Sequence, residues 1–294
     1  MTSVDSGSTP AETLLATPAP DDAGAETADR YEWQAMMATA DALSMYFQAL
    51  DDDGNLIEGF EFTVICEHHE DWAIVKGTVA EIVSGKHREA SVGPFSTHRQ
   101  LFDDGGLLHM FDRWSALGKK PLCRLVTTAG LSKAAAKLTN ICERLRVDLA
   151  TPDADIDEVV SSVVQVIVAL KTTKEVTPAP ESEGAIRAFL AALMIQDSEA
   201  RRDHVPDMAP HRYGRQIAER LGHREAGGAI WDSVLGLVRQ RMRAAGPSKG
   251  GSLPTVLGVP HDSALASRQL RNCQKLWIGG VSGDLRSRGL VVGR

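Results

Sequence analysis

Residues 59–88 read GFEFTVICEHHEDWAIVKGTVAEIVSGKHR, and this stretch decides the fold class. Apolar and polar residues alternate over 59–66, which is typical of a β-strand with one buried face. Residues 71–76 predict a second strand and residues 78–86 a third. Gly77 allows a tight turn between these two strands, because glycine adopts backbone conformations that strain other residues. The stretch therefore predicts three consecutive strands.

Helical patterns flank these strands. Residues 31–50 place apolar side chains at helical spacing, and the run DDDGN at 51–55 ends the pattern. A second helical region follows a loop at 91–97, where Ser96 or Thr97 can cap it. Its apolar residues lie on both sides of the Gly105-Gly106 pair, which interrupts the helix: Leu101, Phe102, Leu107, Leu108, Phe111 and Trp114.

A fourth, buried strand is predicted at 121–127 (PLCRLVT). The order is helix, three strands, helix, strand. Residues 30–150 are therefore expected to form an α/β core whose mixed sheet is flanked by helices.

The rest of the chain is expected to be mainly helical with a loop-rich end. Residues 1–29 carry many acids and no aromatic residue, so they predict a disordered acidic tail. One helix is expected at 132–149, at the end of the core. The helices expected in the region 151–294 are 155–170, 184–196, 213–221 and 227–245. A linker is expected at 177–183 (TPAPESE), and a loop at 246–260.

Composition excludes several classes of protein. The chain has 294 residues, 43% of them hydrophobic, and no apolar run approaches the length of a membrane span. Its start lacks a basic region followed by an apolar stretch, so no signal peptide is predicted. The four cysteines form no CxxC pair, which argues against structural zinc and disulfides. A cytoplasmic protein without a membrane partner is expected.

Charge is distributed unevenly along the chain. The net charge is −7, which at first argues against nucleic acid as a partner, but residues 1–30 alone hold six acids and one arginine. Residues 197–294 hold sixteen Lys or Arg against nine Asp or Glu. A basic segment of this kind suits contact with a polyanion, and it equally suits a solvated helical surface.

Polar residues gather where the predicted strands end. Residues 67–71 (EHHED) are an acidic cluster between the first two strands, and residues 84–88 (SGKHR) close the third. Phosphodiester cleavage needs carboxylates that hold a hard cation such as Mg²⁺, and a cation such as lysine that stabilises developing charge. Ser84 and Lys86 share one face of their strand, because side chains alternate. The pattern predicts a hydrolytic site on adjacent strands.

This arrangement resembles the PD-(D/E)xK nuclease superfamily, and more narrowly the endonuclease domain of CD-NTase-associated anti-phage effectors. The resemblance covers about residues 31–149. It rests on these residues: Tyr31-Glu32-Trp33-Gln34, Glu67, Glu70-Asp71, Lys86-His87-Arg88, Leu101-Phe102, Phe111, Trp114 and Leu125-Val126-Thr127-Thr128. It implies a restriction-endonuclease-like fold and Mg²⁺- or Mn²⁺-dependent cleavage of double-stranded DNA in bacterial antiviral defence.

The resemblance also implies roles for individual residues. Asp71 binds the metal, helped by Glu67 or Glu70, and Lys86 is the catalytic lysine. Gln34 is a helix residue that faces the site. From the strand end, His87 and Arg88 are expected to contact DNA phosphates.

Ser84 departs from the family pattern, which has an acid or a glutamine two residues before the lysine. A hydroxyl is a poorer Mg²⁺ ligand than a carboxylate. Ser84 could act through its hydroxyl or a bridging water, or Glu67 or Glu70 could replace the missing acid. Alternatively the chemistry is weakened, and a DNA-binding or protein-interaction module of a defence system remains.

Each candidate also has a structural interpretation. Asp71 alone could be a strand-start acid, and Lys86 to Arg88 a solvated strand end. Gln34 could be a buried, hydrogen-bonded core residue. A helical scaffold with a fortuitous motif, and self-association into a homo-oligomer, both stay open.

Overall fold

The computed structural model describes residues 23–173, 182–244 and 255–257. Its centre is an open mixed sheet with the strand order β5-β4-β3-β2-β1-β6. β1, β2 and β3 form antiparallel pairs, whereas β3, β4 and β5 run parallel. The strands are β1 (Phe62–His68), β2 (Glu70–Lys76), β3 (Val79–Lys86), β4 (Leu122–Thr127), β5 (Leu193–Gln196) and β6 (Thr255–Leu257).

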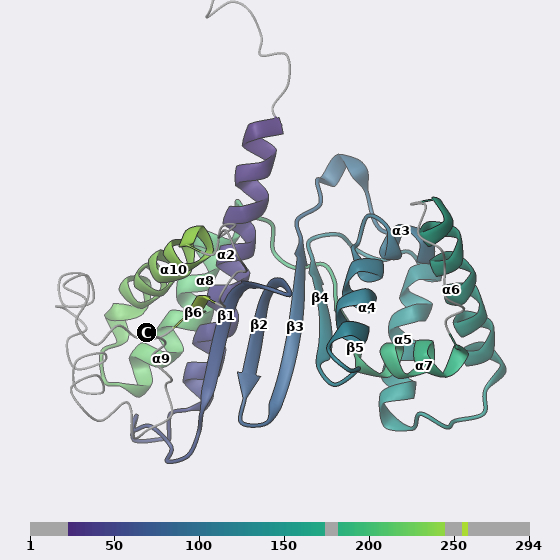
Figure 1. The fold of residues 1–294 in the computed structure, drawn as a ribbon. Helices are drawn as coiled ribbons and strands as arrows, with labels where there is room; N and C mark the ends of the chain where they lie inside the picture. Colours follow the sequence, from purple (N-terminus) through teal and green to yellow (C-terminus); the bar gives the residue numbers. More distant parts are fainter. Residues whose placement is uncertain (1–22, 174–181, 245–254, 258–294) are drawn as a thin grey trace, which may run out of the picture.

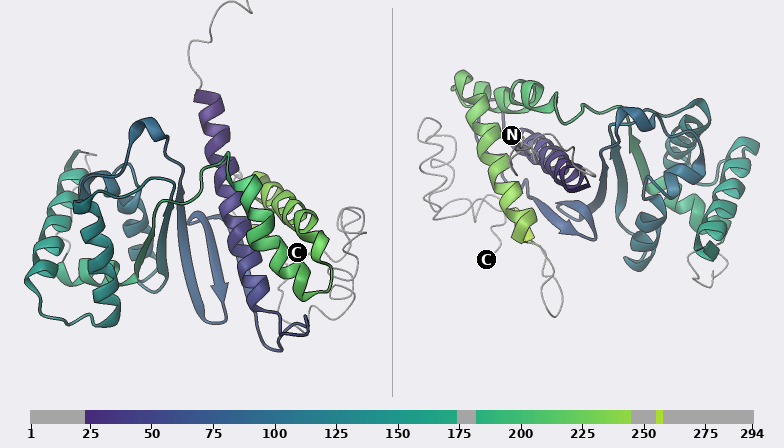
Figure 2. Two further views of the ribbon diagram at one scale, coloured as in Figure 1. Left: turned by 180° about the vertical axis from the view of Figure 1, so that it is seen from behind. Right: turned by 90° about the horizontal axis from the view of Figure 1, so that it is seen from above.

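One face of the sheet packs against α2 (Ala23–Gln48), which runs along β1 to β3 (Figure 1). C-terminal segments pack outside α2 and share its apolar cluster. They are α8 (Val205–Ala209), a π-helical turn (Pro210–Gly214), α9 (Arg215–Arg220), a short 3-10 turn (Arg224–Ala226) and α10 (Gly227–Ala244). The two views of Figure 2 show this group on the opposite side of the sheet from the remaining helices.

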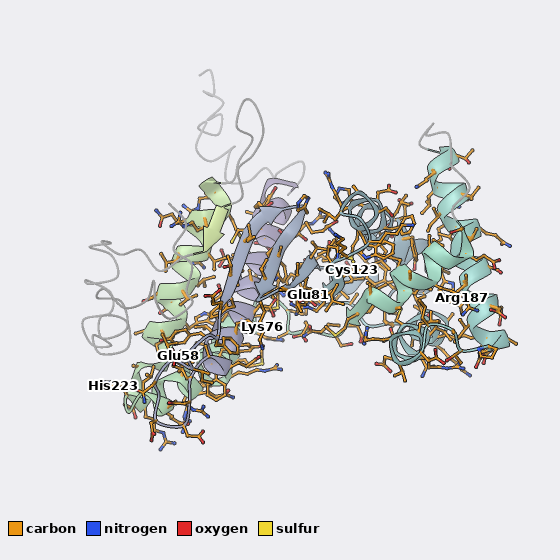
Figure 3. All side chains as sticks on the ribbon, turned by 60° about the horizontal axis from the view of Figure 1, so that its bottom comes forward. Glu58, Lys76, Glu81, Cys123, Arg187 and His223 are labelled. Atoms are coloured by element: carbon orange, nitrogen blue, oxygen red, sulfur yellow. The ribbon has the colours of Figure 1, made fainter. Side chains whose placement is uncertain are left out.

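The other face carries a second apolar cluster built from five helices. They are α3 (His98–Phe102), α4 (Leu107–Ala116), α5 (Lys133–Val147), α6 (Ala154–Thr173) and α7 (Glu183–Ala192). In Figure 3 the labelled residues Lys76, Glu81 and Cys123 mark the strands between the two helical groups, with His223 in one group and Arg187 in the other. The sheet is therefore the middle layer of the molecule.

Side-chain alternation assigns each strand residue to one of these clusters. Val83 of β3 belongs to the α2 cluster, whereas Ile82 belongs to the α4 cluster. In the same way Trp72 of β2 lies toward α2 and Ala73 toward α4. Because residues two apart share a face, Asp71, Ser84 and Lys86 are placed on the α4 side of the sheet.

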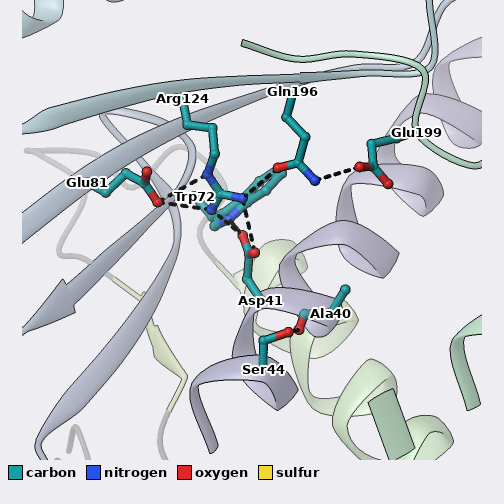
Figure 4. Close-up of polar contacts among 8 residues, drawn as sticks. All are labelled: Ala40, Asp41, Ser44, Trp72, Glu81, Arg124, Gln196 and Glu199. Atoms are coloured by element: carbon teal, nitrogen blue, oxygen red, sulfur yellow. Dashed lines mark hydrogen bonds and ion pairs between the residues drawn. The ribbon is translucent and has the colours of Figure 1, made fainter. Parts of the chain in front are cut away.

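A buried polar network ties α2 to the sheet (Figure 4). Arg124 of β4 donates hydrogen bonds to the carboxylates of Asp41 and Glu81 and to the side-chain oxygen of Gln196. The Trp72 indole N–H donates to Asp41 at 2.8 Å. Burial alone would disfavour the arginine charge, but these carboxylates raise the pKa of Arg124. One guanidinium thus connects α2 with β3, β4 and β5.

The predicted α/β class with a mixed sheet between helices is confirmed. Four predicted strands form close to their expected bounds, as do the helices expected at 132–149, 155–170 and 227–245. The expected interruption at Gly105-Gly106 separates α3 from α4, and the Thr97 side chain caps α3 by accepting a hydrogen bond from the Gln100 amide.

Other expectations need correction. α2 begins at Ala23, inside the tail predicted as disordered. The helix expected at 184–196 ends at Ala192 and continues as strand β5, because a short apolar run such as LMIQ satisfies either pattern until a neighbour pairs with it. Likewise Thr255–Leu257, within the expected loop at 246–260, pairs with β1. The mainly helical second half therefore also contributes strands to the sheet.

Residues 1–22 and most of the expected linker at 177–183 lie outside the described residues. Within the ranges that the structure describes, no helix has the length and apolar character needed to cross a membrane.

Candidate functional site

Asp71 and Lys86 meet on the α4 side of the sheet. The Lys86 ammonium nitrogen lies 3.9 Å from Asp71 Oδ2. The same oxygen accepts hydrogen bonds from the Gly85 backbone amide at 2.6 Å and from the Ser84 hydroxyl at 3.4 Å. The β2–β3 pairing runs from Lys76↔Val79 to Trp72↔Val83, so the Gly85 amide lies just beyond it. The predicted convergence of the acid and the lysine is therefore present.

The environment of Asp71 disfavours its charge. Burial raises the pKa of Asp71, and the Lys86 charge and the Gly85 and Ser84 hydrogen bonds lower it only in part. The side chain keeps 19% of its surface exposed. A buried carboxyl of this kind, close to a lysine, is more typical of a functional site than of a solvated strand end.

The start of α4 closes over Lys86. Gly106 caps α4 in the left-handed conformation, with φ 76°. A Cβ at this position would lie 3.0 Å from Lys86 Cε and 3.9 Å from the Ser84 hydroxyl oxygen. Glycine is needed here both for the backbone angle and for the close approach of the lysine.

A second carboxylate, Glu70, pairs with His109 of α4. The His109 Nδ1 lies 2.7 Å from Glu70 Oε1. The Glu70 side chain is only 5% exposed, whereas the His109 ring is 59% exposed. Burial raises the pKa of Glu70, and the charges of His109 and Lys86 oppose this effect. Sequence reasoning missed His109, because it lies 39 residues from Glu70 in an ordinary amphipathic helix.

Glu67 is a third carboxyl group beside Asp71. Its backbone has a positive φ of 51° near the end of β1. Its Oε1 is buried and has no hydrogen-bond partner among the described residues. Burial, with the neighbouring Asp71 charge, raises the pKa of Glu67 to about 7. The carboxyl therefore has an unsatisfied oxygen next to Asp71.

Gln34 contacts the backbone of β3 from the α2 face of the sheet, opposite the face that carries Asp71 and Lys86. Its amide nitrogen donates to the Gly85 carbonyl at 3.0 Å. A Cβ on Gly85 would meet Trp72, Gln34 and Trp33, so this residue faces α2 while Ser84 and Lys86 face α4. Gln34 therefore contacts the backbone of Gly85, whose amide donates to Asp71, from the α2 side of the sheet, and its role in the site stays a prediction.

The side chains of His87 and Arg88 point into the protein, where neighbouring residues contact both of them. The His87 side chain is 6% exposed and packs 5.8 Å from the Trp33 ring. Arg88 is 11% exposed, donates to the Gly93 carbonyl at 3.0 Å and lies over the Phe95 ring. Burial also lowers the pKa of His87. This geometry does not favour the expected DNA contacts of these two residues.

The oxygen donors suit a hard divalent cation. No group of three or more His, Cys, Asp or Glu in the described ranges is arranged to hold a metal ion. However, Mg²⁺ is commonly held by one or two carboxylates, with water and substrate phosphate completing its shell. Glu67, whose Oε1 is unsatisfied, and Asp71 fit that description, whereas one Glu70 oxygen is engaged by His109.

No protein-family model matches the chain, and neither the curated proteins nor the solved structures contain a significant match. A proposal for its function therefore depends on the geometry of this site together with the sequence pattern.

Proposed function

We propose that this chain is a metal-dependent endonuclease that cleaves double-stranded DNA, with a restriction-endonuclease-like core and a role in bacterial anti-phage defence. The observation that carries the proposal is the meeting of Asp71 and Lys86 from adjacent strands, 3.9 Å apart. Both side chains stay partly exposed, Lys86 at 32% and Asp71 at 19%, and a carboxylate with an ammonium group is the combination that metal-dependent phosphodiester hydrolysis uses.

Each residue of the site has a separate role in this proposal. Asp71 and Glu67 are the carboxylates that would hold Mg²⁺ or Mn²⁺, and a cation there would supply Lewis-acid charge neutralisation at the scissile phosphate. Lys86 keeps 32% of its side chain exposed, so it can reach a phosphate oxygen or the attacking water. Its ammonium group stabilises the negative charge that develops in the transition state.

Ser84 orients Asp71 in this proposal. Its side chain is completely buried, and its hydroxyl donates to Asp71 Oδ2. A hydroxyl that donates its proton to a carboxylate positions that carboxylate, and it adds no negative charge for a metal. Glu67 then takes the place of the second acid.

Plasmid cleavage tests the proposal. The purified full chain is incubated with supercoiled plasmid and Mg²⁺ or Mn²⁺, with EDTA as the metal-free reference. Wild type should nick or linearise the plasmid, while Asp71→Asn and Lys86→Met should not. Lys76→Met, at the other end of β2, is the matched control and should cleave normally. Plasmid left intact by wild type with both metals contradicts the proposal.

A second function is favoured by one observation, the buried Ser84 at the position of the second acid. The chain would then bind DNA without efficient cleavage. Fluorescence anisotropy with a labelled duplex separates the two cases. Binding that weakens with salt, without cleavage, supports the binding module. Absence of both binding and cleavage favours a helical scaffold with a fortuitous motif.

A further inference from the structure

Adjacent residues of β2 pair with basic groups from two different elements. Asp71 faces Lys86 of β3, and Glu70 binds His109 of α4. Both carboxylates are largely buried, whereas both basic side chains are partly exposed at 32% and 59%. The basic groups thus form the solvent-facing side of the site, and the carboxylates lie beneath them.

His109 has one nitrogen engaged and one available. Nδ1 contacts Glu70 Oε1 at 2.7 Å, which fixes the ring orientation. Nε2 has no hydrogen-bond partner in the part of the chain that the structure describes. The contrast with His87 is clear, because that ring is buried against Trp33 and cannot reach a ligand.

His109 and Lys86 flank the same turn of α4. His109 is three residues after Gly106, and residues three apart lie on one side of a helix. Lys86 lies close to this helix end, because a Cβ placed at Gly106 would be 3.5 Å from the Lys86 Nζ. Electrostatic coupling agrees with this placement, because the charges of both Lys86 and His109 act on the pKa of Asp71.

We propose that His109 is a second substrate-contacting residue, whose Nε2 meets a phosphate oxygen of the DNA backbone, and that Glu70 is its positioning residue. This inference rests on the proposed nuclease function. An imidazole nitrogen contacts a phosphate oxygen directly when it carries a proton, or through one bridging water when it does not. Contacts to phosphates hold a duplex in register without reading its sequence.

Chemical footprinting tests the contact without relying on turnover. The full chain is treated with diethyl pyrocarbonate in EDTA, with and without a saturating duplex oligonucleotide, and histidine modification is followed by mass spectrometry. The duplex should slow modification of His109 several-fold. His211 is the matched control, because it is exposed on the C-terminal helices across the sheet and should react at an unchanged rate.

Kinetics of variants complete the test. His109→Ala and Glu70→Gln should raise the KM for DNA several-fold, with unchanged melting temperatures, while His211→Ala leaves KM and kcat unchanged. If wild type cleaves DNA but His109 reacts equally fast in the complex, this inference is overturned and the nuclease proposal stands. If wild type neither binds nor cleaves DNA, both proposals fail together.

Discussion

The carboxylate of Asp71 accepts the backbone N–H of Gly85 at 2.6 Å. This bond satisfies a buried amide of β3 just beyond the pairing with β2, so the proposed catalytic acid also has a structural role. Loss of activity in a single Asp71 variant would therefore mix two effects, and a pair of variants is needed to separate them.

Asp71→Asn and Asp71→Ala should differ in stability but not in activity. Asparagine keeps an oxygen for the Gly85 amide, and it removes a charge that burial disfavours, so its unfolding free energy should equal or exceed that of wild type. Alanine leaves the amide without a partner, at a cost of about 1–3 kcal/mol. Urea denaturation measures both, and neither should cleave plasmid. Equal destabilisation by the two variants would contradict the hydrogen-bonding role.

Gly106→Ala should damage the site, and Gly118→Ala should not. Both glycines have a positive φ, 76° and 72°, so each substitution costs about 1–2 kcal/mol in backbone strain. Only at Gly106 would the new Cβ press on Lys86, at 3.0 Å from Cε, because the nearest atom at Gly118 is 4.0 Å away. Plasmid cleavage should fall in the first variant alone, at matched loss of thermal stability. Similar cleavage by both would place Lys86 outside the chemistry.

Glu67 should make stability depend on pH. Its folded-state pKa is about 7, above the unfolded value of 4.5, so the folded state binds the proton more tightly. Stability should therefore fall as pH rises from about 4.5 to about 7. Glu67→Gln lacks this effect, so its free energy of unfolding should equal that of wild type at pH 4 and exceed it at pH 8. Urea unfolding at several pH values measures the difference, with the exposed Glu58→Gln as control. A difference that does not change with pH would contradict the burial of Glu67.

Binding of a divalent metal should reverse the loss of stability that the Glu67 charge causes at high pH. A ligand that binds only the folded state stabilises it by about 2.7 kcal/mol at a hundred times its dissociation constant. At pH 8, Mg²⁺ or Mn²⁺ should therefore raise the melting temperature of wild type, and of Glu58→Gln equally. Glu67→Gln and Asp71→Asn should show a much smaller rise. The same rise in all four proteins would indicate that the cation binds elsewhere.

Arg124→Met should strongly destabilise the fold. The change leaves Asp41 and Glu81 near each other without their shared cation, and losing one partner of a buried ion pair costs about 3–5 kcal/mol. Adding Asp41→Asn and Glu81→Gln should recover part of this loss. Lys137→Met, which removes two surface ion pairs, with Asp155 and Glu158, should change stability little. Calorimetry or urea unfolding distinguishes these cases, and a mild effect of Arg124→Met would show that the network is solvated.

Sequence patterns predicted much of the sheet and the central pair of the site. Alternation over 59–66 located the first strand, the apolar run over 71–76 and the turn at Gly77 located the next two, and side-chain parity placed Ser84 and Lys86 on one face. Side-chain alternation puts Glu81 on the opposite face from Lys86, and Glu81 binds Arg124 on the α2 side. These predictions succeeded because side-chain direction along a strand is a local property.

The elements that the sequence did not predict also have a physical explanation. β5 and β6 are short, and their strand conformation depends on pairing with β4 and β1, which lie far away in the sequence. The start of α2 within the acidic tail likewise could not be located from composition, because the tail carries no apolar pattern that marks a helix boundary.

The sequence by itself determined the class of the fold and the meeting of an acid with a lysine, because the periodicity of a strand depends only on residues that are neighbours in the sequence. Only the tertiary structure decided which other groups join them. Packing of α4 across the sheet brings His109 to Glu70 and Gly106 to Lys86, and α2 holds Gln34 behind Gly85. Packing also buries His87 and Arg88. Such contacts join residues tens of positions apart, and no local pattern specifies them.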